Sequence, residues 1–352
     1  MTDPVPAAAR TYTKQEQEPA TDEIVEVAPG VVRTQLPIQM PGLGHVNCYI
    51  LEDARGVALV DPGLPGPKPW KALTARLQQA GVPLKRVHTV IVTHSHPDHF
   101  GGAARLHRET GARIVTHRAF GSRWHPTPSD DADLEDERPR RPRWDPTTPW
   151  GGAAPRPPKR KQLAYRWAAR RNRFFPRPTL RLADADTIEL AGRTWVAVHT
   201  PGHTADHLCL LDPERGGFLS GDHVLPTITP HIGALPDYED SLATFFASLD
   251  KVAALDARTS IVLPAHGKPF TDLKGRAEAI KVHHSERLER LAAASVELGR
   301  PASVMEFSTH LFKPRSLGPM ADSETYAHLE HLRLLGRAEA QRVDGVLEYR
   351  IG

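Results

Sequence analysis

The sequence predicts an α/β protein, with mixed sheets flanked by helices, that continues into a smaller C-terminal module of the winged-helix kind. Short β-branched runs bounded by Gly, Pro and Asp alternate with helical segments early in the chain, and paired strands follow later. After Lys274 the pattern changes to three helical segments and then two alternating runs around Asp344-Gly345, which indicates a β-hairpin. A chain of 352 residues is long enough for both units.

The first half of the core domain alternates strands with helices. We expect strands within 23–38, 46–53, 56–63, 86–94 and 113–119, where β-branched residues cluster between turn residues. Amphipathic or small-residue segments predict helices at 69–81 and 101–112. This alternation indicates a sheet with helices packed against it.

The second half of the core domain contains paired strands, and the C-terminal module is mostly helical. Two strands are expected in each of 186–204 and 207–224, a helix at 241–255, and at 259–267 a strand that ends in a loop. Helices are then expected within 275–298, 303–312 and 323–336, followed by a hairpin at 337–351. Three helices and a hairpin are typical of a winged-helix module.

Two segments differ in character from the rest of the chain. Residues 1–22 are polar and without periodicity and are predicted to be a disordered leader, before a core domain at 23–274 and the winged-helix-like module at 275–352. Residues 121–180 interrupt the core pattern with an acidic run, a Pro/Arg-rich stretch and a basic segment. We interpret them as an insertion that caps the core domain.

Composition argues against a membrane protein. No window approaches the roughly 18 uninterrupted apolar residues of a membrane-spanning helix. The N-terminal segment has no apolar core and carries early acidic residues, so we predict a cytoplasmic protein. Cys48 and Cys209 lie far apart in strand-like contexts and are predicted to be buried free thiols. The oligomeric state is not specified by the sequence.

Histidine is the most informative residue type, with 19 copies, many of them beside Gly, Pro or Asp. Four metal-capable side chains occupy one turn after a β-branched strand: His94, His96, Asp98 and His99. Imidazole and carboxylate suit zinc, and one turn cannot wrap all four groups around a single tetrahedral ion. The sequence therefore predicts two adjacent ions, each of which needs further ligands from elsewhere in the chain.

Three more candidate ligands stand at the ends of predicted strands. His203 lies in HTPGHT, Asp222 in GDH and His266 in PAHG, each beside Gly or Pro. Taken singly, each of these residues is compatible with an ordinary loop position. Their repetition at separate strand ends predicts that they complete the metal site.

In this order, THSHPDHFGG, HTPGHT, GDH and PAHG, with VDPG around Asp61, resemble the metallo-β-lactamase superfamily over residues 60 to 270. The resemblance implies an αββα sandwich with a binuclear centre. It implies one metal ion bound by His94, His96 and His203, a second bound by Asp98, His99 and His266, and Asp222 as a bridge. The end of the chain resembles the winged-helix extension of the branch with mammalian β-lactamase-like endoribonucleases and fungal polyketide thioesterases. HTPGHTADH is also similar to the matching stretch of hydroxyacylglutathione hydrolases.

The implied chemistry is hydrolysis by a hydroxide that bridges two divalent cations, Zn²⁺ being expected and Fe or Mn being the alternatives. Asp98 is expected to bind its metal and to carry a proton to the leaving group. Three residues are candidates for orienting ligands through hydrogen bonds: Asp61, His207 and His223. No substrate-binding residue is identifiable from the sequence.

Three functions remain open at this point. Hydrolysis of a small ester or thioester, such as an acyl-thiol or lactone, ranks first. A metal-dependent endoribonuclease is the alternative, because the basic segment 156–181 with its interleaved aromatic residues could follow a phosphate backbone. A winged-helix DNA-binding metal sensor ranks third, since a complete ligand set favours an enzyme.

Overall fold

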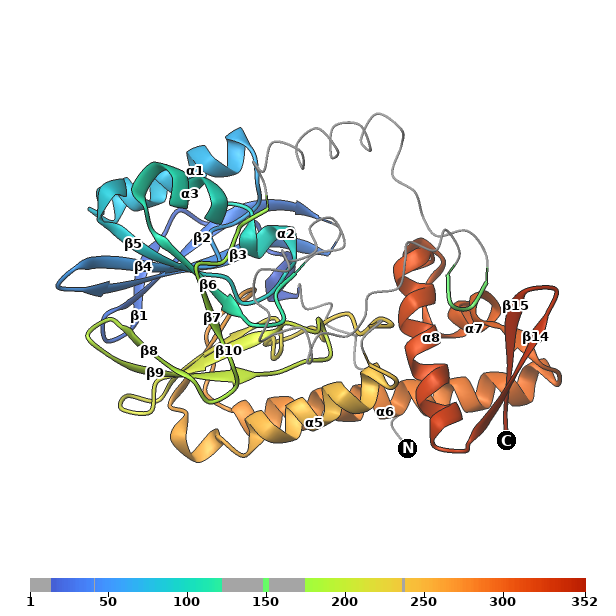
Figure 1. Cartoon of the computed structure of the whole chain (residues 1–352). Coiled ribbons are helices and arrows are strands. Elements are labelled where there is room, and N and C mark those ends of the chain that lie inside the picture. The colour runs from blue at the N-terminus through green and yellow to red at the C-terminus, as the bar shows by residue number, and fades with distance from the viewer. Residues whose placement is uncertain (1–13, 41, 122–147, 152–174, 236–237) are drawn as a thin grey trace, which may run out of the picture.

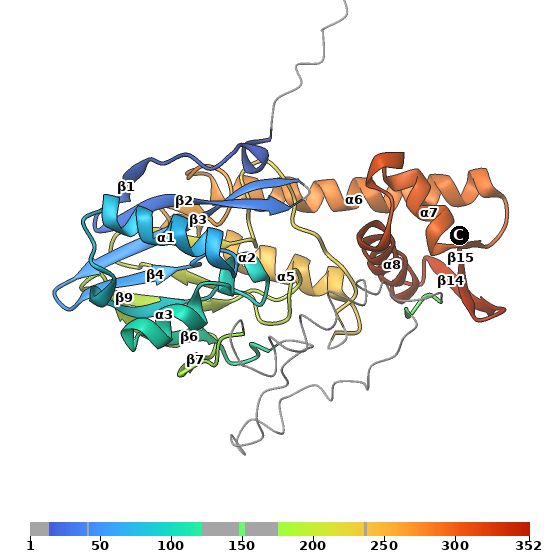
Figure 2. The same cartoon turned by 90° about the horizontal axis from the view of Figure 1, so that it is seen from above.

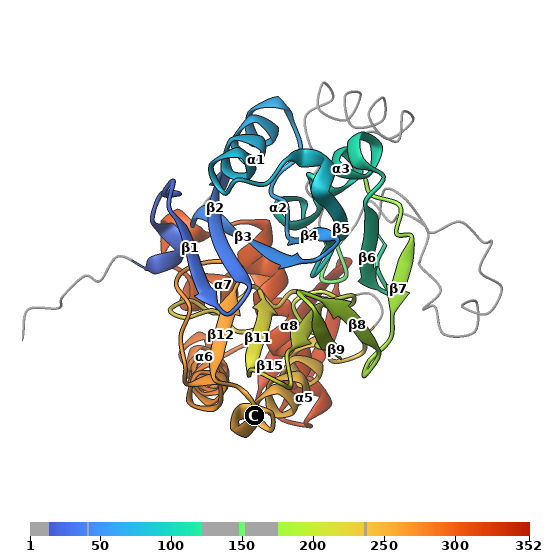
Figure 3. The ribbon, with the colours of Figure 1, turned by 90° about the vertical axis from the view of Figure 1, so that its left-hand side faces the viewer.

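The structure, a computed structural model, describes residues 14–40, 42–121, 148–151, 175–235 and 238–352. Its larger part has four layers, in which two β-sheets face each other and helices cover both outer faces (Figure 3). The predicted αββα sandwich is therefore confirmed. The helices α6, α7 and α8 with a small sheet form a module at one end of the sandwich (Figure 1).

The first sheet has seven strands in the order of the chain. These strands are β1 (Ile24–Ala28), β2 (Val31–Met40), β3 (Leu43–Asp53), β4 (Gly56–Val60), β5 (Val87–Ile91), β6 (Arg113–His117) and β7 (Leu180–Leu182). Strands β1 to β4 pair antiparallel, whereas β4 to β7 pair parallel. Parallel neighbours need a crossover, and α1 (Pro67–Gln79) and α3 (Ala103–Thr110) provide it between β4 and β6. Leu73, Leu77 and Leu106 on these helices are buried against the outer face of the sheet.

The second sheet has five strands in the order β12-β11-β10-β9-β8. These strands are β8 (Thr187–Leu190), β9 (Arg193–His199), β10 (Leu208–Leu211), β11 (Gly217–Gly221) and β12 (Ile261–Pro264). All pairs are antiparallel except β11 with β12, which are joined through α5 (Ser241–Ala253). Helices α5 and α6 (Leu273–Leu298) cover the outer face (Figure 3).

The space between the two sheets is apolar. Tyr49 and Val60 of the first sheet meet Trp195 and Leu210 of the second, and all four side chains are at most 2% exposed. The indole N–H of Trp195 donates a hydrogen bond to the Leu190 carbonyl at 3.1 Å, so its one polar atom is paired. Each sheet is thus buried on both faces, which explains the continuous apolar strands in the sequence.

The C-terminal module shares its longest helix with the sandwich. Helix α6 has 26 residues and would span about 39 Å, enough to reach from the second sheet into the module (Figure 2). The module also contains β13 (Ala302–Ser303), α7 (Val304–Leu311), α8 (Pro319–Leu334), β14 (Ala338–Val343) and β15 (Val346–Ile351). Its sheet has the order β13-β15-β14, and Asp344 and Gly345 take positive φ in the predicted hairpin turn.

Short helical turns complete the described chain. They are η1 (Gln15–Gln17), η2 (Leu84–Arg86), α2 (Pro97–Phe100), η4 (Asp256–Arg258) and η5 (Pro314–Ser316). Residues 1–13 of the expected disordered leader lie outside the described residues, whereas in its remaining part η1 is helical and Glu16 is 0% exposed. Its carboxylate accepts hydrogen bonds from the backbone N–H groups of Thr227 and Ile228, a long-range partnership that local sequence does not reveal.

Part of the predicted insertion docks on the C-terminal module. The ring of Trp150 lies 5.2 Å from that of Tyr326 on α8, and the backbone N–H of Leu347 donates to the Trp150 carbonyl at 2.9 Å. Residues 122–147 and 152–174 lie outside the described residues, and most of the basic segment falls there.

The structure also describes the two cysteines and the character of the helices. Cys48 and Cys209 are both free and buried, as predicted. Among the helices of the described ranges, none combines the length and the apolar character needed to cross a bilayer.

Candidate metal centre

The turn after β5 is shaped by prolines and glycines. Pro97 opens the short helix α2, where its lack of an N–H group costs no hydrogen bond. A Cβ atom on Gly101 would lie 2.1 Å from the Pro65 backbone nitrogen, and one on Gly102 would lie 2.5 Å from the Pro62 carbonyl oxygen. Only glycine permits this close approach, which holds the turn against the loop that follows β4.

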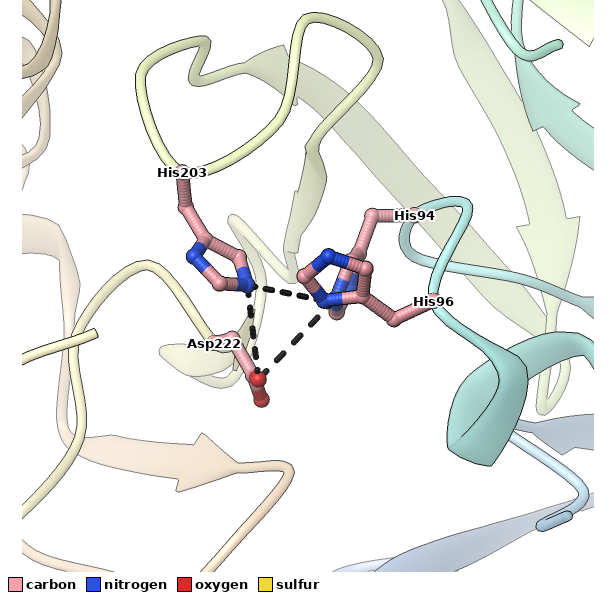
Figure 4. Close-up of side chains that lie close together, drawn as sticks. All are labelled: His94, His96, His203 and Asp222. Atoms are coloured by element: carbon pink, nitrogen blue, oxygen red, sulfur yellow. Dashed lines mark hydrogen bonds and ion pairs between the residues drawn. The ribbon is translucent and has the colours of Figure 1, made fainter. Parts of the chain in front are cut away.

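One cluster of potential metal ligands comes from three separate loops. His94 and His96 lie before α2, His203 follows β9 and Asp222 follows β11, and their ligand atoms lie within 4.8 Å of one another (Figure 4). His96 Nδ1 is 2.9 Å from His94 Nε2 and 3.1 Å from His203 Nε2. Ligand atoms about 2.1 Å from a tetrahedral zinc ion stand about 3.4 Å apart, so these spacings fit a bound cation.

A second cluster adjoins the first and contains Asp98, His99 and His266. Asp98 Oδ2 is 3.5 Å from His99 Nε2 and 3.6 Å from His266 Nε2. Asp222 also reaches this cluster, with Oδ1 3.3 Å from His266 Nε2 and Oδ2 3.6 Å from His99 Nε2. The fold thus brings all seven predicted ligands together, with the Asp222 carboxylate between the two clusters.

Several polar atoms in the site are buried without a hydrogen-bond partner in the described structure. They are Nε2 of His99, Nε2 of His266 and Oδ1 of Asp222. Such atoms are costly unless something satisfies them, and divalent cations coordinated by these same atoms would do so. The donor set therefore fits a pair of metal ions.

The outward-facing nitrogens of the ligand histidines are held by hydrogen bonds. Nδ1 of His99 donates to Asp61 Oδ2 at 2.8 Å. Nδ1 of His203 and of His266 donate to the backbone carbonyls of His231 at 2.8 Å and His45 at 2.6 Å. Each bond places the proton on Nδ1 and leaves Nε2 as an electron-pair donor that points into the site.

Asp61 connects the two clusters from behind. It adopts a positive φ of 54°, and its carboxylate accepts hydrogen bonds from the Thr93 N–H at 2.9 Å and the Thr93 hydroxyl at 2.8 Å. The Thr93 hydroxyl in turn lies 3.1 Å from Nδ1 of His94. Asp61 therefore supports His99 directly and His94 through Thr93.

We expect Asp61→Asn to weaken metal binding by about 10- to 100-fold and to lower the free energy of unfolding by about 1–3 kcal/mol. Asparagine tolerates the left-handed backbone, but its amide NH₂ would face one of the three donors that the carboxylate now satisfies. Chelator competition and urea denaturation of the same preparation measure the two effects. Unchanged metal affinity alongside reduced stability would show that Asp61 is only a structural residue.

The other two residues predicted to orient ligands behave differently. His207 accepts a hydrogen bond at Nε2 from the backbone N–H of Asp222 at 3.0 Å, and its Nδ1 donates to Thr200 at 2.7 Å. It therefore holds the backbone of Asp222. His223 instead packs against Phe245, with ring centroids 5.2 Å apart, and neither of its ring nitrogens has a hydrogen-bond partner among the described residues.

Sequence reasoning missed His45 and His231 as supports of the site. Both contribute a backbone carbonyl, and every residue carries one, so no side-chain signal could have identified them. His45 also uses its ring, because Nδ1 donates to the Glu18 carbonyl at 2.8 Å and Nε2 accepts from the Gly267 N–H at 3.0 Å.

Burial and charge set the protonation of the two clusters. Burial lowers the pKa of His203, and lowers that of His96 to about 3, so these imidazoles are neutral at physiological pH. Burial opposes charge on His99 as well, but the nearby carboxylates of Asp98 and Asp222 outweigh it and raise the His99 pKa. His96 and His203 in the first cluster are thus neutral imidazoles, whereas in the second cluster the carboxylates of Asp98 and Asp222 favour the protonated form of His99.

A third group with suitable spacing lies between α6 and α8, and it consists of His284, Glu324 and His328. Here the guanidinium of Arg287 already lies 2.6 Å from Glu324 Oε1 and balances its charge. His328 Nε2 is paired with His284 Nδ1 at 3.0 Å. We therefore assign this group to packing and hydrogen bonding.

Comparison with known proteins agrees with the geometry. Residues 41–266 match the family model described as the metallo-beta-lactamase superfamily. An atrochrysone carboxyl ACP thioesterase of Aspergillus fumigatus is 27% identical over 278 residues, which cover 77% of this chain and 66%, just under two thirds, of the thioesterase. A hydroxyacylglutathione hydrolase of Albidiferax ferrireducens is 27% identical over 67% of this chain and 68% of its own length.

A solved structure extends the similarity beyond residues 41–266. The crystal structure of a metallo-beta-lactamase family protein from Thermus thermophilus superposes with a TM-score of 0.74 at 30% identity. The match covers 93% of this chain and 100% of that protein, so it includes the C-terminal module. The family model, these similarities and the paired His/Asp clusters lead to one conclusion: the chain belongs to the metallo-β-lactamase superfamily.

Proposed function

We propose that this protein is a two-metal hydrolase that cleaves an ester or thioester bond in a small molecule. One observation carries the proposal, namely two adjacent His/Asp clusters that share the buried carboxylate of Asp222. Similarity to a thioesterase and to a hydroxyacylglutathione hydrolase supports an acyl-thiol as the substrate class. Zn²⁺ is the cation we propose, with Fe or Mn as alternatives, because nitrogen and oxygen ligands suit all three.

The proposed roles follow from the geometry. Bound divalent cations supply Lewis acidity, which lowers the pKa of water and stabilises negative charge on the substrate oxygen. The seven clustered residues would hold the cations, while hydrogen bonds from Asp61, His207, His231 and His45 orient these ligand residues. Water adds its oxygen to the acyl carbon, the bond to sulfur or oxygen breaks, and the leaving group departs with a proton.

Asp98 is the residue we propose to move that proton. Burial would raise its pKa, but His99 and His266 outweigh burial and hold the pKa at about 2. Its carboxylate is therefore ionised, and Oδ2 lies between the two imidazoles at 3.5 and 3.6 Å. An ionised carboxylate at this position can accept a proton from the attacking water and deliver it to the leaving group.

The C-terminal module is proposed to be a winged helix. Three helices and a C-terminal hairpin, as expected from the sequence, support this proposal, and the short strand β13 between α6 and α7 is an element that the sequence did not predict. The boundary proposed at residue 275 falls in the first turn of α6. The cytoplasmic location remains a prediction from sequence.

A substrate panel tests the proposed function. Metal-loaded protein is assayed against acyl-thiols, lactones, oxygen esters, a phosphodiester and short RNA at two ionic strengths, with the impaired variant His96→Ala as the control. We expect turnover of the carbonyl substrates that responds little to salt. RNA cleavage whose apparent affinity falls steeply with salt would instead support the endoribonuclease alternative.

Metal removal is expected to destabilise the protein measurably. A cation that binds only the folded state contributes about 2.7 kcal/mol when its free concentration is about 100 times Kd, so two ions contribute about 5 kcal/mol. Chelation should lower Tm by roughly 10 °C, and stoichiometric Zn²⁺ should restore it. Differential scanning calorimetry in paired buffers measures the shift, and equal Tm values with and without chelator would contradict the metal assignment.

A further inference from the structure

The chain between β11 and α5 is irregular but buried. Residues 223–235 contain no helix or strand, yet Val224, Leu225 and Ile232 are at most 2% exposed. Buried backbone without regular structure needs hydrogen-bond partners from elsewhere in the fold. This segment, which we call the post-Asp222 loop, is held by side chains distant in sequence.

The first half of the post-Asp222 loop is held by α6. Arg276 donates hydrogen bonds from its guanidinium to the backbone carbonyls of Leu225 and Ile228, both at 2.6 Å. Two charge-assisted bonds from one side chain fix the path of the loop as it leaves Asp222. Glu16 of η1 secures the same stretch through the two backbone N–H groups described above.

The second half of the loop is held by α8. The His231 ring donates from Nδ1 to Glu324 Oε2 at 3.3 Å, and the Ala234 N–H donates to the Ser323 hydroxyl at 3.3 Å. A Cβ atom on Gly233 would lie 2.7 Å from the Ser323 oxygen, so the loop backbone rests directly on α8. The carbonyl of His231 is the group that accepts the hydrogen bond from Nδ1 of His203.

Glu324 is well suited to hold His231. Glu324 is 7% exposed, and its Oε1 accepts a hydrogen bond from Arg287 at 2.6 Å. Its other carboxylate oxygen, Oε2, faces His231. Burial would raise the Glu324 pKa, but the bond from His231 and the charge of Arg287 hold it at about 2. The carboxylate is therefore a fixed acceptor in a continuous chain from Arg287 to His203.

We propose that Glu324 is a positioning residue for the metal centre, acting from the C-terminal module through His231 to set the ring orientation of His203. The module would then be part of the site's architecture and not only an appended domain. The inference rests on the proposed function in one respect, that His203 binds a cation. The test of this inference requires that the protein binds metal, but it requires no knowledge of the substrate.

A double-mutant cycle on the full-length chain tests the inference. Apo forms of wild type, Glu324→Gln, His231→Ala and the double variant are titrated with Co²⁺ and Zn²⁺ against a competing chelator. We expect each single change to weaken one of the two binding steps by about tenfold and to alter the Co²⁺ absorption bands. The double variant should be no weaker than either single variant, because Glu324 acts through His231.

Glu330→Gln is the matched control. Glu330 lies on the same helix and pairs with Arg333 and with the Tyr349 hydroxyl, away from the post-Asp222 loop. Its replacement should leave both binding steps and the Co²⁺ spectrum within about twofold of wild type, even where Tm falls.

Each remaining outcome decides the question. If Glu324→Gln leaves metal affinity unchanged, or weakens it equally in the His231→Ala background, then Glu324 does not act through His231 and the proposal is wrong. Wild-type protein that binds two ions but hydrolyses no ester or thioester would overturn only the proposed function. Wild-type protein that binds no ion would overturn both.

Discussion

Replacement of Asp222 by asparagine is expected to lower kcat/KM by at least about 1,000-fold and to reduce bound metal from two ions per chain to less than one. Among the seven clustered residues, Asp222 is the one whose carboxylate contacts histidines of both clusters, at 3.7 Å from His203 and 3.3 Å from His266. An amide of the same size keeps the shape but removes the negative charge that two cations would share. Elemental analysis and initial rates measure the two losses.

Asp53→Asn is a suitable control for this experiment. Asp53 also carries an ionised carboxylate, but it pairs with Arg55 in the turn between β3 and β4. It should retain full metal and full turnover. An Asp222→Asn protein that matched this control in both measurements would remove the two-metal interpretation.

Asp98→Asn is expected to separate proton transfer from metal binding. An asparagine oxygen can still face a cation, but it cannot carry a proton at neutral pH, so kcat should fall by about 100- to 10,000-fold for alkyl oxygen esters. Aryl thioesters have leaving groups that depart without a proton, and their rate should fall much less. Steady-state kinetics with both substrate classes measures this difference.

The control for Asp98→Asn is a variant that lacks a different metal ligand, one that has no proposed role in proton transfer. His96→Ala should impair the oxygen ester and the aryl thioester by the same factor, because His96 belongs to the cluster that lacks Asp98. Equal losses on both substrates in Asp98→Asn as well would show that Asp98 delivers no proton to the leaving group.

Local chemistry explains why the ligands could be predicted. His94, His96, Asp98 and His99 crowd one turn, and a Pro and two Gly residues dictate that the turn follows a strand directly. The remaining ligands also occur where apolar strands end at Gly or Pro, a pattern that the local sequence shows directly. The hairpin at Asp344-Gly345 was predictable for the same reason, since those two residues accept positive φ.

Contacts between residues distant in sequence could not be predicted in this way. The carbonyls of His45 and His231 support His266 and His203, but the sequence separations are 221 and 28 residues. Glu16 lies in a polar segment that resembles a disordered leader, and its burial depends on backbone N–H groups 211 and 212 residues away. Trp150 likewise stands in an aperiodic insertion, and only its contact with α8 reveals it as an anchor.

The sequence by itself determined the α/β class, the C-terminal hairpin and the identities of the seven clustered residues, because each depends on residue type and short-range spacing. Only the tertiary structure decided that Asp61 supports one histidine from each cluster and that α8 reaches the loop beside His203. The residues involved are distant in sequence. They come into contact only when the two sheets pack together and α6 places the C-terminal module against the loops. Long-range packing chooses such partners, and residue type alone does not encode them.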